Sequence, residues 1–175
     1  NEAFVLPTRS FVKGDVDHAI ESADHVVETQ LYVRGQEHFY LEGQISLALP
    51  TEDGGVHVIS SSQHPSEVQK LVASVLGINI HQVQSETRRM GGGFGGKESQ
   101  AAVLACTASL FAIRNGRSVK YRLPRQDDMV QTGKRHDFWN RYRAGVTDQG
   151  VIVGVQMELA GLCGCTADLS EGIVD

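Results

Sequence analysis

The chain has 175 residues, of which 41% are hydrophobic, which is enough for one core of ordinary size, so we expect a single domain. Its 21 acidic and 16 basic side chains give a net charge of −5 with the basic residues scattered, which argues against a nucleic-acid-binding protein. Because there is neither a run of about 18 apolar residues nor a signal-peptide pattern at the amino end, we expect a cytoplasmic protein that does not enter a membrane.

The first part of the chain predicts a short helix, an extended segment and a hairpin. Asp15 can cap a helix that runs to Ala23, and extended structure is expected over residues 26–33. Apolar residues then alternate over residues 45–49, and the turn residues 53–55 follow them. This pattern predicts a β-hairpin.

Two main helices are predicted in the middle of the chain. Apolar residues recur at helical spacing over residues 65–76, with Pro65 suited to the first turn and Gly77 just past the end. The second helix is predicted over residues 98–114, where most side chains are small or apolar, and Gly116 ends it. That composition predicts a helix buried on most sides.

Extended segments complete the expected layout. They are short strands over residues 82–87 and 118–123, with a turn or short helix over residues 124–130 after the second, and a hairpin closed by residues 147–150. The sequence therefore predicts an α+β fold, in which a mixed sheet with hairpins accompanies two main helices.

The glycine-rich stretch MGGGFGGKES, residues 90–99, fits two phosphate-binding patterns and completes neither. Gly91, Gly93 and Gly96 spell the G-x-G-x-x-G of a dinucleotide site, which should be followed about 20 residues later by an acid that binds a ribose. The next strand ends instead in Arg122 and Arg125. A Rossmann site is therefore not predicted.

The second pattern is the P-loop, G-x-x-x-x-G-K, which ends here at Lys97. A P-loop continues with Ser or Thr, whose hydroxyl binds magnesium, but this chain continues with Glu98, which would repel a triphosphate. Two interpretations remain open. Either the loop serves close packing and Glu98 caps the next helix from its first turn, or Glu98 and Phe94 face one cavity and contact a planar ligand.

No metal site is predicted from side-chain spacing. Cys106, Cys163 and Cys165 lack zinc-finger and CxxC spacing, so structural thiols are expected. His38 and Glu42 stand four residues apart, but the segment between them is expected to be extended or irregular, where they would not converge. A structural role is the better interpretation for both.

Three motifs together resemble a known family. GQEHFYLE (residues 35–42), SSQHP (residues 61–65) and RMGGGFGGKE (residues 89–98) resemble, in this order, the molybdenum-binding part of the xanthine dehydrogenase and aldehyde oxidase family. The resemblance covers nearly the whole chain. It implies that residues 1–175 are a partial molybdopterin-binding domain, the first portion of the large-subunit catalytic region.

The resemblance also implies roles for single residues. Gln63 matches the glutamine whose amide hydrogen-bonds an oxygen ligand of the metal, and Gly93, Phe94 and Gly95 match residues that approach the cofactor and the substrate ring. Glu98 matches the acid that positions a purine in the xanthine branch, whereas aldehyde oxidases usually carry a non-acidic residue there. A purine substrate is therefore favoured over an aldehyde.

The implied activity is that of a molybdenum hydroxylase that oxidises hypoxanthine or xanthine to urate, with water as the oxygen source. Electrons would pass through [2Fe-2S] clusters and FAD, on other domains or subunits, to NAD. The general base and the remainder of the large subunit lie outside this chain by the same resemblance, so the chain alone is expected to be inactive. The alternatives are an aldehyde-oxidising relative and a noncatalytic packing or interaction domain.

Overall fold

The computed structural model describes residues 4–174, and its helices and sheets make an α+β fold, as predicted. The chain divides into two compact units. Gln36–Arg135 form one, and the segments before and after them, up to Gly35 and from His136, form the other. Within the described residues, no helix is long and apolar enough to cross a membrane.

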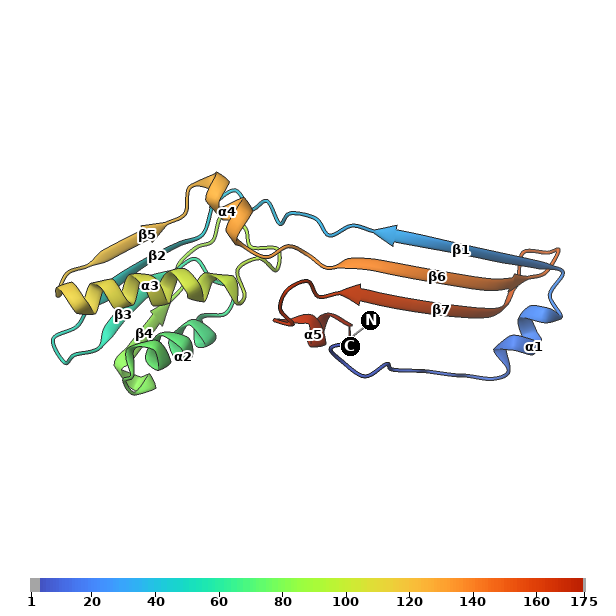
Figure 1. The fold of residues 1–175 in the computed structure, drawn as a ribbon, viewed down its shortest axis with the longest axis horizontal. Helices are drawn as coiled ribbons and strands as arrows, with labels where there is room; N and C mark the ends of the chain where they lie inside the picture. The colour runs from blue at the N-terminus through green and yellow to red at the C-terminus, as the bar shows by residue number, and fades with distance from the viewer. Residues whose placement is uncertain (1–3, 175) are drawn as a thin grey trace. The chain divides into compact units, whose positions relative to one another are not determined.

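The unit built from the two chain ends contains an antiparallel three-stranded sheet in the order β1-β6-β7 (Figure 1). The predicted hairpin at residues 147–150 joins β6 to β7, and Asp15 caps α1 by accepting the His18 amide at 3.1 Å, as expected. The elements of this unit are α1 (Val16–Glu21), β1 (His25–Val33), β6 (Asp137–Val146), β7 (Ile152–Leu162) and α5 (Ser170–Val174).

The Gln36–Arg135 unit contains a four-stranded mixed sheet in the order β4-β3-β2-β5, in which only β3 and β4 run parallel. α3 packs against β2, β3 and β5, and α2 packs against β4 and α3 (Figure 1). The mixed sheet, the β2–β3 hairpin and the two main helices confirm the predicted architecture. The elements are β2 (Ile45–Pro50), β3 (Val56–Ser60), α2 (Pro65–Leu76), η1 (Ile80–Gln82), β4 (Val83–Glu86), α3 (Gln100–Asn115), β5 (Val119–Arg122) and α4 (Arg125–Gln131).

The ends of the two main helices follow from local chemistry, with one correction. Gly77 and Gly116 take left-handed conformations, with φ of 67° and 60°, directly after α2 and α3, so both predicted ends are confirmed. α3 begins at Gln100 rather than at Glu98. The Lys97 carbonyl accepts the Gln63 amide at 2.8 Å, and this bond to a distant segment keeps the chain from entering the helix earlier.

Burial of α3 differs from the prediction. Small residues including Ala105 and Ala108 are fully buried, but Val103 is 63% exposed and Phe111 is 54% exposed. The helix therefore has one buried stripe and one open apolar face, where a helix buried on most sides was expected. Composition alone could not reveal this, because the small residues that fit against the sheet are interleaved with larger ones that point away from it.

A pair of substitutions on α3 tests this assignment of faces. We expect Ala105→Leu to lower the free energy of unfolding by about 1–3 kcal/mol, because the added atoms enter a filled core. Val103→Leu should change it by less than about 0.5 kcal/mol, since that side chain is exposed. Urea unfolding followed by far-UV circular dichroism measures both. Equal effects of the two variants would contradict the arrangement.

A charged side chain, Lys97, lies fully buried where the glycine-rich segment meets the sheet. Its Nζ donates to the Glu42 carbonyl at 2.7 Å, to Glu42 Oε2 at 3.1 Å and to Ser61 Oγ at 2.9 Å, and it lies 4.6 Å from the centre of the Tyr40 ring. Burial lowers the pKa of Lys97, and the charge and hydrogen bond of Glu42 oppose that shift. The ammonium thereby joins three chain segments.

Replacement of this lysine tests how much the unit depends on it. We expect Lys97→Met to lower the free energy of unfolding by about 2–3 kcal/mol, because the acceptors on Glu42 and Ser61 lose their donor. Lys134→Met is the matched control, since Lys134 pairs with Glu37 at the surface and such pairs contribute at most about 1 kcal/mol. Urea titration measures both. If the two variants were equally stable, the buried ammonium would not hold this region together.

Candidate functional site

Residues 90–99 form a loop between β4 and α3, and three of its glycines are required by close packing. A Cβ added at Gly91 would lie 2.6 Å from Glu42 Cβ, and one at Gly96 would lie 2.7 Å from the His38 ring. At Gly93 the added atom would lie 2.5 Å from Gln63 Oε1. The packing interpretation of the glycines is thus confirmed for these three positions.

The loop is fastened to Gln63, which follows β3. Gln63 Oε1 accepts the amides of Gly95 at 3.0 Å and of Lys97 at 3.2 Å. Because only the carbonyl end of the side chain can accept from two N–H groups, these bonds fix which way the amide points. Gln63 Nε2 has no acceptor among residues 4–174, and the residue is exposed. The side chain therefore presents a free donor outward.

The loop amides divide into two sets. Those of Gly91, Gly95, Gly96 and Lys97 donate to acceptors within the unit. The next set, the consecutive amides of residues 92–94, has no acceptor among the residues that the structure describes. Three consecutive amides of this kind could donate together to an anionic or carbonyl group of a ligand, as a loop that offers backbone donors was expected to do.

Phe94 stands out on this loop by its backbone and its exposure. Its φ of 53° is rare for a residue with a side chain and costs roughly 1–2 kcal/mol, so the surrounding structure must impose it. Its ring is 62% exposed, and its carbonyl accepts from the Arg135 guanidinium at 3.4 Å. A strained backbone that displays an aromatic ring is typical of a ligand-contacting position.

Glu98 is half-buried near the end of the loop, and the interpretation that it caps α3 from the first turn, one of the two left open, does not hold. Ser99 is the residue before the helix, and the first turn of α3 contains no acid. Burial, reinforced by the nearby Arg135 charge, lowers the pKa of His38, while the Glu98 carboxylate acts in the opposite direction.

Side chains that the sequence did not single out hold the loop from behind. The buried Gln44 amide donates to the Gly96 carbonyl at 2.8 Å and to the Tyr40 hydroxyl at 3.0 Å, and that hydroxyl donates to Asp128 at 2.6 Å. Burial, with the bond to Asp128, raises the pKa of Tyr40 to about 12. No local signal marks this network, because Tyr40 and Asp128 are 88 residues apart and α4 reads as a polar surface helix.

The acid Glu42 has the structural role that was expected for it. Partial burial works to raise the pKa of Glu42, but hydrogen bonds from Ser61, from the Gly91 amide and from Lys97 outweigh it and hold this pKa below its ordinary value. The segment from His38 to Glu42 is irregular, as predicted. Within residues 4–174, no three His, Cys, Asp or Glu side chains gather where they could hold a metal ion.

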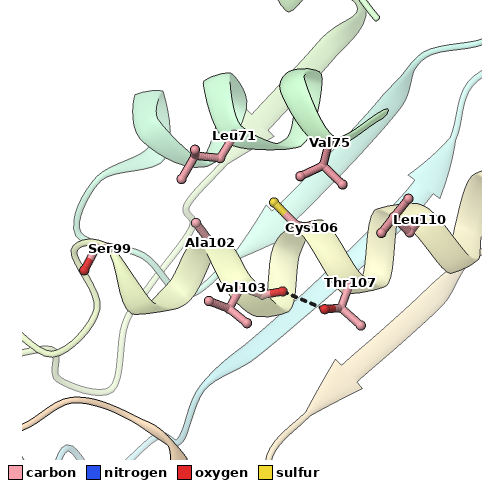
Figure 2. Close-up of a pocket in the computed structure, with 8 residues that line it drawn as sticks. All are labelled: Leu71, Val75, Ser99, Ala102, Val103, Cys106, Thr107 and Leu110. Atoms are coloured by element: carbon pink, nitrogen blue, oxygen red, sulfur yellow. Dashed lines mark hydrogen bonds between the residues drawn. The ribbon is translucent and has the colours of Figure 1, made fainter. Parts of the chain in front are cut away.

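A separate apolar groove lies between α2 and α3 (Figure 2). Leu71 and Val75 form one wall, and the other wall comes from α3 and includes Val103 and Cys106. Only Ser99, at the amino end of α3, connects it in sequence to the glycine loop. Its lining is mostly apolar and contains no acid or base, and its polar atoms come from Ser99, Cys106 and Thr107.

Comparison with known proteins identifies the family of the chain. A family model described as the molybdopterin cofactor-binding domain matches residues 3–175. The chain is 38% identical over 175 residues to xanthine dehydrogenase/oxidase of Gallus gallus, covering 99% of this chain and 13% of that protein. It is 39% identical over 176 residues to aldehyde oxidase 2 of Macaca fascicularis, covering 100% of this chain and 13% of that protein.

A solved structure of an aldehyde oxidoreductase shares this fold. The aldehyde oxidoreductase from Desulfovibrio gigas superimposes with a TM-score of 0.73 and 25% identity over 85% of this chain and 16% of that one. The chain thus spans about an eighth of the length of the curated relatives named above. By its sequence and its fold, the chain belongs to the molybdopterin cofactor-binding domain family of the xanthine dehydrogenases and aldehyde oxidases.

Proposed function

We propose that the chain is the first portion of the molybdopterin-binding region of a longer molybdenum hydroxylase that oxidises hypoxanthine or xanthine to urate. Membership of the family supports the molybdopterin-dependent redox chemistry. The purine substrate rests on one observation, the half-buried carboxylate of Glu98 beside the loop that displays Phe94. In this proposal the ring and the acid, four positions apart on the loop, face one ligand, and such a pair suits a planar heterocycle with hydrogen-bonding edges.

The residues of the loop fit the cofactor. The free Gln63 Nε2 can donate to an oxygen at the metal, and the amides of residues 92–94, which have no acceptor among the described residues, suit the polar groups of the pterin and its phosphate arm. Bound molybdopterin supplies the metal centre that activates oxygen from water and takes up the electrons of the substrate. The chain itself positions the cofactor and the substrate, through Gln63, Gly93, Phe94 and Gly95.

The substrate would be oriented by Glu98 and Phe94. The Phe94 ring covers one side of a planar ligand, and Glu98 hydrogen-bonds its edge and stabilises charge that develops on the ring during oxidation. A noncatalytic packing domain would use Glu98 as a helix cap, and Glu98 lies outside the first turn of α3, which favours the catalytic role. Aldehyde oxidation is the second candidate, since aldehyde oxidases are as similar to the chain as xanthine dehydrogenases are.

The remaining parts of the reaction belong to polypeptide outside this chain. We place there the remainder of the large subunit with the general base, and a FAD and iron–sulfur portion or subunit that carries [2Fe-2S] clusters and delivers electrons to NAD. The small share of the relatives that the chain covers supports this division. The chain alone is then inactive, and the complete enzyme is proposed to be cytoplasmic.

A substitution at Gln63 separates its structural role, which is to hold the loop amides, from its proposed role in catalysis. We expect Gln63→Glu in the complete enzyme to keep the bonds to the Gly95 and Lys97 amides but to lose the outward donor, lowering kcat about 100-fold or more at unchanged thermal stability. Gln63→Met loses both the carbonyl acceptor and the amide donor, so it should also lower the thermal stability of the enzyme. Molybdenum content, thermal unfolding and xanthine turnover are measured together. Full activity of Gln63→Glu would contradict the proposed role.

The choice of substrate depends on Glu98. We expect Glu98→Gln to lower kcat/KM for xanthine about 100-fold, because a preorganised charge at the reacting ring is lost, and to change kcat/KM for benzaldehyde less than about threefold. Glu67→Gln on α2, where Glu67 pairs with His64, is the matched control and should alter neither value. Steady-state rates with both substrates decide. An enzyme that oxidises benzaldehyde but not xanthine would establish the aldehyde-oxidising alternative.

A further inference from the structure

The three-stranded sheet β1-β6-β7 has two chemically different faces. Its register places Val27 beside Ala144 and Ala144 beside Val155, and successive residues along each strand point to opposite faces. One face therefore carries the odd-numbered residues of β1 and β7 from Val27 to Leu159 and the even-numbered residues of β6. We call it the apolar face.

The apolar face contains no charged side chain. Six large aliphatic or sulfur-containing side chains on it are between 43% and 61% exposed: Val27, Leu31, Val33, Val155, Met157 and Leu159. Phe138, Tyr142 and Ala144 extend it along β6. α5 covers only one end, where a Cβ on Gly161 would lie 2.9 Å from Val174 Cγ1. Among the described residues of its own unit, the rest of this face has no second layer.

The opposite face carries charged side chains among its apolar ones, which include Val26 and Tyr32. Arg141 and Glu28 form an ion pair on it at 2.5 Å, and Arg143 and Glu158 lie on the same side. α1 packs there on two glycines, since a Cβ on Gly145 would lie 2.9 Å from Ile20 Cα and one on Gly154 would lie 3.1 Å from Ala19 Cβ. A sheet with one polar and one apolar face is built to bury the apolar one against another layer.

We propose that the apolar face is covered by a further layer of the same polypeptide, from the part that lies outside this chain. This inference rests on the proposed function, in which the chain is a portion of a longer enzyme. The curated relatives named above are about eight times as long as the chain, so most of their polypeptide is available to supply such a layer. The occupant is an apolar helix or sheet face, because every large side chain that it meets is uncharged.

The absence of charge on this face favours a permanent layer over a transient partner. Surfaces that bind and release partners are about as polar as the rest of a protein, whereas a face made only of apolar and small polar side chains resembles a core cut in half. A second copy of the chain has matching chemistry. A layer tethered in the same polypeptide, however, is present at a far higher effective concentration than a second copy.

Neighbouring residues on β7 provide a matched test. Met157 lies on the apolar face and the exposed, uncharged Gln156 on the other, so Met157→Cys and Gln156→Cys are made singly in the complete polypeptide. Each native protein is treated with a maleimide, and labelling of the peptide that contains the new thiol is followed by mass spectrometry. We expect Met157→Cys to react at least about tenfold more slowly than Gln156→Cys, because a covered thiol reacts only after local opening.

Equal labelling rates in the two variants would overturn the proposal. Protection of Met157→Cys that disappears on dilution, as size-exclusion chromatography shows dimers separating, would also overturn it, since a second copy would then be the occupant. Neither rate depends on molybdenum or turnover. Intact mass and xanthine turnover report separately on whether the chain is a portion of a working hydroxylase, so a failed function and an uncovered sheet are distinguishable.

Discussion

The glycine loop depends on one buried cation. The loop has few side chains of its own that could enter a core, and Lys97 replaces them by sending its ammonium inward to Glu42, Ser61 and the face of Tyr40. A buried charge is unfavourable unless its donors are satisfied, and here the three oxygen acceptors satisfy them. The lysine that would meet a phosphate in a P-loop is therefore structural here, and its position fixes the loop against two other segments.

Gln63 and the glycines divide the loop into an inner and an outer side. The Gln63 carbonyl binds two loop amides, Gly93 lets the side chain approach, and Gln44 holds the Gly96 carbonyl from the core. These contacts fix the backbone while the amides of residues 92–94 and the Gln63 amide nitrogen remain available. A cofactor site benefits from hydrogen-bond donors that are unpaired and already fixed in position. Such preorganised donors lose little conformational freedom when the ligand binds.

The two compact units differ in how completely they bury their apolar surface. In the Gln36–Arg135 unit, α2 and α3 cover the mixed sheet and enclose a core of valines and alanines. The sheet β1-β6-β7 has α1 on its polar face and leaves most of its apolar face open. α3 also leaves Val103 and Phe111 exposed. Contiguous exposed apolar surface of this kind is typical of a face that contacts another layer, and the chain covers only about an eighth of the length of its relatives.

The sequence by itself determined most of the elements, the fold class and the family, but not α5 or the first residue of α3. The helix ends could be predicted because the residues there, Pro65, Gly77 and Gly116, act through their own backbone preferences. The motifs around Gln63 and Phe94 could be recognised because each is a contiguous stretch of sequence. Only the tertiary structure decided that Lys97 turns inward, that Tyr40, Gln44 and Asp128 form one network, and which face of α3 is open. Those outcomes depend on contacts between residues tens of positions apart, and no periodicity or local propensity encodes them.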